Sequence, residues 1–155
     1  MERGAVSGAD DGEGPVIVGM AEAAMHMFTA SIDSLPDPSD SDFSERAAVI
    51  LSGLRKLQTS LSQAATRSRT TPAVIVALSG VRSCYDDLME LAADAPGATL
   101  GQRLYTARRR AKLSAPETAN GAGLREDLLD AVEAEEKPTE DEAAQINDLI
   151  AALSA

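Results

Sequence analysis

Apolar residues that recur every three or four positions constrain this chain more than any other feature of its sequence. They form one stripe between residues 44 and 66 and a second between residues 71 and 93. The first stripe consists of Ala47, Ile50, Leu54, Leu57 and Leu61, and the second of Val74, Leu78, Val81, Tyr85 and Leu88. This spacing places side chains on one face of an α-helix, whereas the side chains of a strand alternate between two faces. The sequence therefore predicts an all-α protein.

The composition agrees with a helical interior. Hydrophobic residues make up 44% of the 155 residues, while aromatic residues make up only 3% and there is no Trp. Ala and Leu supply most of the apolar side chains, and both lose little rotamer freedom in a helix. A chain of this length can form one domain of ordinary size or two small ones.

Prolines and glycines mark the expected boundaries. A first helix over about 16–35 is followed by the sequence PDPSDSD at 36–42, which cannot continue it. The sequence DAPGAT at 94–99 is expected to be a linker, so residues 16–95 are predicted to form a three-helix unit for dimerisation or partner binding. The acidic and Gly-rich residues 1–15 are predicted to be a disordered lead-in.

Several functional classes lack the residues they would need. His26 is the only histidine and Cys84 the only cysteine, so no catalytic triad, zinc site or internal disulfide is expected. No Gly-rich phosphate loop is present. No apolar run approaches the roughly 20 residues that span a bilayer, and the amino terminus lacks the pattern of a signal peptide. We therefore expect a cytoplasmic protein with no enzymatic activity, cofactor, metal or membrane contact.

The last third of the chain divides into short helical segments at about 99–111, 115–121, 124–135 and 140–153. Ser114 and Glu117 have the spacing of a capping box, and Gly123 stands where a turn requires a left-handed backbone. The apolar residues fall where three of these helices would share a core. They are Leu104, Ala107, Ala119, Leu124, Leu129 and Val132.

This segment resembles the Xre family, the helix-turn-helix domain of Cro and the lambdoid phage repressors. The family pattern is roughly LGxRLRxARxxxGLSQxxLAxxxGVSxxxISxxExGxxxP. The matching residues are Leu100, Gly101, Arg103, Leu104, Ala107, Arg108, Leu113, Ser114, Ala119, Gly123, Glu133 and Pro138. The resemblance implies a four-helix domain over about 99–155, a salt bridge between Arg108 and Glu133, and DNA binding by a transcriptional regulator.

The residues at the expected reading surface depart from the family pattern. Arg125 replaces the serine or threonine that opens the recognition helix, and Glu126, Asp127 and Asp130 stand where base edges are usually contacted. From Glu117 to Asp148 there are eleven acidic residues and two basic ones. Because specific binders gain much of their affinity by neutralising phosphates, this charge opposes DNA binding.

Two basic segments stand out in a chain whose formal net charge is −11. The sequence RLYTARRRAK at 103–112 has five bases, and its Arg109, Arg110 and Lys112 are expected to contact phosphate or to pair with the acidic helix. Residues 46–85 contain six bases and no acid. That segment is either a solvated face or a docking surface for an acidic partner, including a second copy of the chain.

Two functions follow from these patterns. The first is a transcriptional regulator that binds DNA through the last third of the chain and dimerises through its amino-terminal helices. The second is a non-catalytic adaptor that keeps the helix-turn-helix scaffold and binds a protein through its acidic face. The fold resemblance favours the first, and the carboxylates at the reading surface favour the second.

Overall fold

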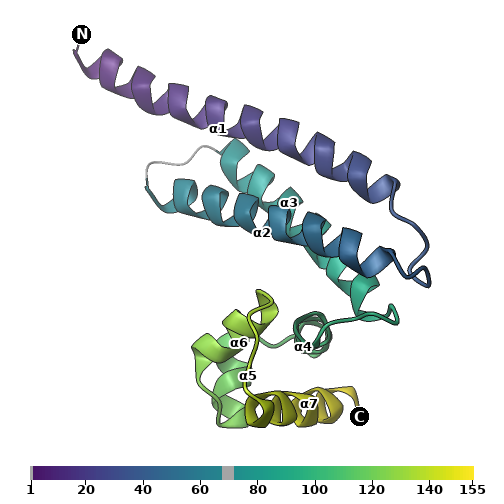
Figure 1. The fold of residues 1–155 in the computed structure, drawn as a ribbon. Coiled ribbons are helices and arrows are strands. Elements are labelled where there is room, and N and C mark those ends of the chain that lie inside the picture. Colours follow the sequence, from purple (N-terminus) through teal and green to yellow (C-terminus); the bar gives the residue numbers. More distant parts are fainter. Residues whose placement is uncertain (1, 68–71) are drawn as a thin grey trace. The chain divides into compact units, whose positions relative to one another are not determined.

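The computed structural model describes residues 2–67 and 72–155, with side chains from residue 14 onward. Seven α-helices form in these residues, and no described residue lies in a β-strand. The predicted all-α class is therefore confirmed (Figure 1). The chain divides into two compact units. The first contains residues 1–36 and 45–87, and the second contains residues 37–44 and 88–155.

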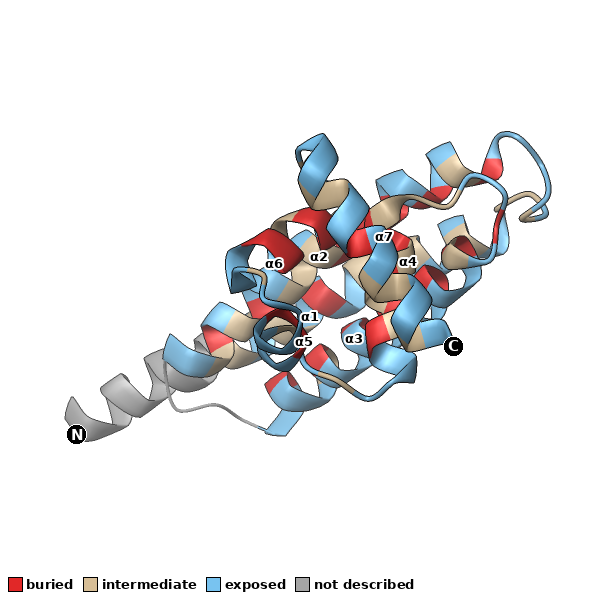
Figure 2. Cartoon of the chain, turned by 90° about the horizontal axis from the view of Figure 1, so that it is seen from below, coloured by how far each residue is buried: buried red, intermediate tan, exposed pale blue. Residues whose placement is uncertain are grey.

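The first unit is built from helix α1 (Glu2–Asp33), helix α2 (Phe43–Arg67) and most of helix α3 (Pro72–Ala93). All five residues of the predicted stripe in α3 and four of the five in α2 are buried, while Leu57 is only half-buried. In Figure 2 the buried positions are coloured red and recur at intervals among the helices. Between the two helices the Arg55 Nη1 donates to the Tyr85 hydroxyl at 3.1 Å.

Helix α1 differs from its prediction at its amino-terminal end. The helix begins at Glu2 and contains Pro15, although residues 1–15 were expected to be a disordered lead-in. Pro15 has no backbone N–H to donate to the carbonyl four residues earlier, so the helix runs through this position with one hydrogen bond fewer. The stretch Gly14–Asp33, with a mean hydropathy of 1.3, is also long and apolar enough to span a membrane by length and composition alone. It is not an uninterrupted apolar run, because Glu22, His26 and Asp33 lie within it.

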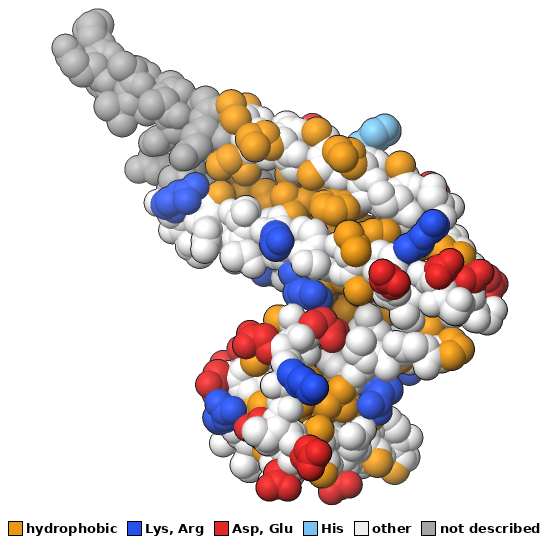
Figure 3. All heavy atoms as spheres, viewed as in Figure 1, with side chains coloured by type: hydrophobic (Ala, Val, Ile, Leu, Met, Phe, Trp, Pro, Cys, Tyr) orange, Lys and Arg blue, Asp and Glu red, His pale blue; other side chains and the backbone are white. Residues whose placement is uncertain are grey.

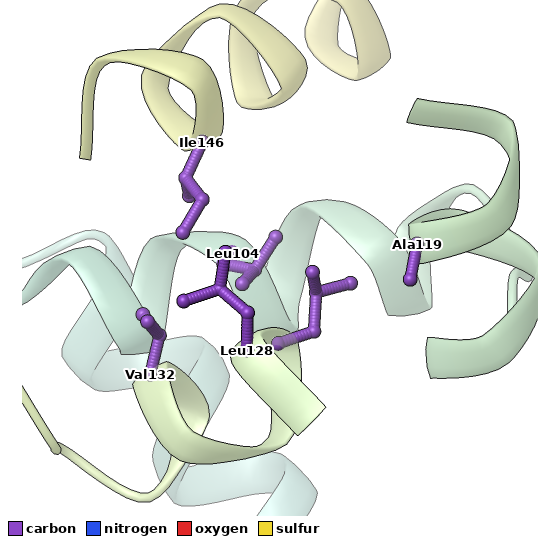
Figure 4. Close-up of a cluster of buried hydrophobic side chains, with 6 residues drawn as sticks. Leu104, Ala119, Leu128, Val132 and Ile146 are labelled. Carbon is purple, nitrogen blue, oxygen red and sulfur yellow. The ribbon is translucent and has the colours of Figure 1, made fainter. Parts of the chain in front are cut away.

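The second unit is built around helices α4 (Leu100–Arg110), α5 (Ala115–Ala122), α6 (Glu126–Glu133) and α7 (Glu140–Ser154). Helix α4 packs against α6 and α7, and α5 packs against α6. The core is shown in Figure 4. It consists of Leu104, Ala119, Leu128, Leu129, Val132 and Ile146. Leu128 and Ile146 were not among the predicted core residues, and Ala107 is only half-buried.

The division between the units falls inside α3, between Asp87 and Leu88, and not at the predicted linker 94–99. The end of α3 contributes the buried Leu88, Met89 and Ala92 to the second unit. Thr106 of α4 donates to the Met89 carbonyl oxygen at 3.5 Å. Sequence composition marks where a helix ends, but it does not show with which neighbours the last turns of that helix pack.

Gly101 allows α4 and α6 to approach closely. A methyl group at this position would collide with the Val132 carbonyl oxygen, which belongs to the backbone and cannot swing away. We therefore expect Gly101→Ala to lower the free energy of unfolding of the second unit by about 1–3 kcal/mol. Chemical denaturation followed by far-UV circular dichroism measures this change.

Gly121 provides a matched control, because it lies in α5 and a methyl group there would have no neighbour within 4 Å. Gly121→Ala should stabilise the protein by about 0.5–1 kcal/mol, since alanine loses less backbone freedom on folding. Equal effects of the two substitutions would contradict the close approach of α4 and α6.

Candidate functional site

Three local features of the sequence fix the two ends of α5 and the turn that follows it. The Ser114 side chain accepts from the Glu117 N–H at 3.2 Å, and the Ser114 N–H donates to the Glu117 carboxylate at 2.9 Å. Gly123 ends α5 with a φ of 71°, which is strained for residues other than glycine. The Leu124 N–H then donates to the Ala119 carbonyl oxygen at 2.9 Å, which closes the helix end.

A buried ion pair connects α4 to α6. The Arg108 Nε and Nη2 donate to the two carboxylate oxygens of Glu133 at 2.9 and 2.8 Å. The Arg108 Nη1 also donates to the Leu113 carbonyl oxygen at 2.9 Å, so the same guanidinium holds the loop before α5. The salt bridge implied by the family resemblance is thus present as a two-pronged pair, and it fixes the start of α5 and the end of α6 relative to α4.

Each partner of this pair shifts the pKa of the other. Burial raises the pKa of Glu133, and the hydrogen bonds and positive charge of Arg108 act against that shift. Burial acts to lower the pKa of Arg108, but the hydrogen bonds to Glu133 together with the charges of Glu133, Tyr105 and Asp130 outweigh it, so the pKa lies above its usual value. Each charge therefore depends on its partner, because water cannot solvate it fully in this site.

The exposed face of α6 is acidic, as the sequence indicated. Glu126 and Asp127 lie in its first turn and Asp130 lies one turn further along, and all three are exposed. Arg125 precedes the helix, and its guanidinium donates to Asp127 at 3.2 Å and to Glu142 of α7 at 2.9 Å. The arginine at this surface is thus already neutralised by carboxylates of the same unit.

A structural role for two of these carboxylates is also visible. The Arg125 side chain does not cap the backbone N–H groups of the first turn of α6. Carboxylates in the first turn of a helix interact favourably with its dipole, so Glu126 and Asp127 stabilise a helix that lacks a capping side chain. Asp130 lies beyond the first turn, where this effect has decayed, so the dipole gives no reason for its charge.

The basic residues of α4 have partners that the sequence did not indicate. Arg110 lies 3.7 Å from Glu90 and 3.5 Å from Asp94, so it pairs with acids at the end of α3 instead of with the acidic helix. Arg109 lies over the Tyr105 ring, 5.8 Å from its centre, and its charge favours the ionised form of Glu133. Lys112 is exposed at the end of α4, with a φ of 62°.

The basic residues of 46–85 are spread over α2 and α3. Arg46 borders a groove near the start of α2, and Arg82 borders a polar pocket of about 250 Å³. Arg55 packs on Tyr85, 6.0 Å from the ring centre, while Arg69 lies outside the described residues. Within the described residues, no group of three His, Cys, Asp or Glu side chains is placed to hold a metal ion.

Of two further contacts in this unit, the sequence can predict one and cannot predict the other. Thr99 and Gln102 form a capping box at the start of α4, and their spacing is the same signal that was recognised at Ser114. The contact between Arg125 and Glu142 joins residues that are 17 positions apart. No local pattern predicts that contact, because it depends on how α7 packs.

Comparison with known proteins places this two-unit helical protein in a family. Residues 28–99 match the family described as MSMEG_6518_N, N-terminal domain. An uncharacterized protein of Mycolicibacterium smegmatis is 69% identical over 127 residues, which cover 82% of this chain and 98% of that protein. The chain belongs to the same family as that protein. No solved structure matches it.

The buried pair predicts a large penalty for breaking it. Arg108→Met should lower the free energy of unfolding by about 3–5 kcal/mol, because it leaves the Glu133 carboxylate buried without a partner. The double variant R108M/E133L should recover most of this loss, since it removes both charges together. Denaturant titrations of both variants measure the difference, and a double variant as unstable as the single one would contradict the prediction.

Lys112 offers a test of backbone strain. Lys112 stands where the Xre pattern that this segment resembles has glycine, and its φ is 62°, a conformation that costs a side-chain-bearing residue about 1–2 kcal/mol. Lys112→Gly removes this strain, but glycine also has more conformational freedom in the unfolded chain, which offsets part of the gain in stability. We therefore expect Lys112→Gly to stabilise the protein by up to about 1 kcal/mol. Lys112→Ala keeps the strain but removes the charge, so a shift of the thermal midpoint in that variant alone would assign the effect to electrostatics.

Proposed function

We propose that this protein is a non-catalytic regulatory adaptor of the cytoplasm. Its Xre-like helix-turn-helix scaffold presents the acidic face of α6 to a basic protein partner. The observation that carries this proposal is the exposure of Glu126, Asp127 and Asp130 beside an arginine that Asp127 and Glu142 already engage. A basic partner would meet a surface on which the carboxylates outnumber the available cations.

Three features support the scaffold. Helices α5 and α6 have eight residues each and are joined by a three-residue turn that begins at the left-handed Gly123. Gly101 lets α4 approach α6, and the Arg108–Glu133 pair fixes the three helices together. These residues are also the ones that carry the family resemblance, so the sequence pattern and the packing have the same physical basis.

Electrostatics separates the adaptor from a DNA reader. A helix in the major groove lies close to phosphates of both strands, and one carboxylate there can accept from cytosine. Three exposed carboxylates without neighbouring free arginines would instead raise the free energy of the complex. The adaptor is therefore the better-supported function for this surface.

A DNA-binding regulator is the second candidate, and the exposed bases at the end of α4 favour it. Arg109 and Lys112 are exposed and precede α5, where phosphate contacts would complement a helix in the groove. Binding through these two residues would be weak and strongly dependent on salt. Such a regulator would need a dimer to reach useful affinity through two half-sites.

The two candidates differ in their response to neutralising the acidic face. We expect the wild-type protein not to shift the fluorescence anisotropy of a labelled nonspecific duplex, even at about 20 mM salt, where phosphate contacts are strongest. The variant E126Q/D127N should gain measurable DNA affinity if α6 can enter the groove. The control variant E140Q/D148N changes net charge equally at exposed positions of α7 and should gain none.

The partner arm of the experiment uses tagged protein and native extract treated with nuclease. Capture of a basic protein should survive the nuclease treatment. It should weaken at least about tenfold for a variant neutralised at Glu126, Asp127 and Asp130, and it should persist for the control variant E140Q/D148N. Salt-sensitive duplex binding by the wild-type chain would overturn the adaptor and establish the regulator.

A further inference from the structure

Helix α1 carries an apolar stripe that is exposed to solvent. Val16, Met20 and Met27 are 61%, 68% and 70% exposed, and Ala23 and Ala30 are exposed between and beyond them. The five positions are separated by four, three, four and three residues. This spacing is the heptad pattern by which one helix packs along another.

A different stripe of the same helix already packs within the unit. Ala21 is only 1% exposed, and the Phe28 ring lies against Gly53 of α2. Ile17 and Ala24 lie on this side of α1 and are half-buried. Helix α1 therefore has two apolar stripes, and its contact with α2 uses only the inner one.

A groove between α1 and α2 runs beside the exposed stripe. Its volume is about 420 Å³, and Met20 and Ala24 of α1 and Leu57 and Leu61 of α2 contribute to its lining. Figure 3 shows hydrophobic side chains gathered along α1 and in the seam beside α2. A helix that covers the exposed stripe would thus also contact apolar surface of α2.

We propose that this stripe binds α1 of a second copy of the chain in an antiparallel pair. A twofold axis midway between Ala23 and Ala24 places Met20 of each copy opposite Met27 of the other. In the same register Val16 lies within one residue of Ala30, and the two Ala23 residues lie within one residue of each other at the centre. Large side chains then face small ones at the ends, and flexible methionines face each other between them. The stripe is complementary to itself in this register.

The charge distribution favours a second copy over a lipid surface. Between Gly14 and Asp33 there is no Lys or Arg, and Glu22 and Asp33 are the only charged residues. Helices that lie on membranes usually carry Lys and Arg, which attract anionic headgroups. An uncharged seam between two identical helices creates no repulsion.

The size of the stripe sets the expected affinity. A 20-residue helix is about 30 Å long and about 10 Å wide, so the stripe and the groove rim would bury on the order of 500 Å² per chain. Stable interfaces usually bury about 800 Å² per partner. We therefore expect a reversible dimer with a Kd on the order of micromolar. The inference concerns α1 alone and is independent of the function proposed for α6.

Sedimentation equilibrium of the full chain over about 1–200 μM tests the proposal, since this range brackets a micromolar Kd. The variant M20E/M27E should raise the dimer Kd at least about 100-fold, which corresponds to about 2.7 kcal/mol. Val76→Glu is the matched control, because Val76 of α3 is 69% exposed, lies in the same unit and is outside the stripe. It should leave the Kd unchanged.

A charge-pair variant tests the antiparallel register. In M20E/M27K, opposite charges face each other across the antiparallel seam, whereas a parallel pair would place like charges together. M20E/M27K should therefore dimerise at least about tenfold more tightly than M20E/M27E. Circular dichroism of each variant checks that the helices remain folded.

Three results would overturn the proposal. The first is a wild-type chain that remains monomeric at 200 μM, roughly a hundredfold above the expected Kd. The second is an equal loss of association in Val76→Glu. The third is binding of the full chain to vesicles of neutral or anionic phosphatidyl lipids, if M20E/M27E abolishes that binding and leaves the oligomeric state unchanged. Such a result would assign the stripe to a membrane.

Discussion

The arrangement of the second unit depends on the buried pair between Arg108 and Glu133. The guanidinium reaches both carboxylate oxygens and the Leu113 carbonyl, so one side chain connects α4, α6 and the loop before α5. A buried ion pair contributes little net stability, because the desolvation of both charges offsets their attraction. Its larger effect is specificity, since any packing that separates the partners leaves a buried charge. We therefore interpret the pair as the interaction that selects this arrangement of short helices.

Glycines allow the backbone to reach the geometry that the pair requires. Gly101 removes the methyl group that would collide with the Val132 carbonyl, and Gly123 takes the left-handed conformation that ends α5. Lys112 takes a comparable conformation without being glycine. Its strain is tolerated because the surrounding caps and the buried pair determine where α5 begins.

The two units carry different kinds of exposed surface. Carboxylates dominate α6, where the proposed adaptor function resides, and an uncharged apolar stripe runs along α1. The first surface favours a cationic partner, and the second favours a surface like itself. A chain that associated through α1 would display two acidic faces, which raises the effective concentration of a bound partner without any new contact.

The sequence by itself determined the helical class, the approximate ends of most helices, the capping box at Ser114 and the turn at Gly123. These features depend on residues close together in the chain, so spacing and side-chain chemistry suffice to predict them. Only the tertiary structure decided that the end of α3 belongs with the second unit, that Arg110 pairs with Glu90 and Asp94, and that Arg125 pairs with Glu142. Those contacts join elements whose relative positions are set by packing, and no local pattern encodes which helices will meet.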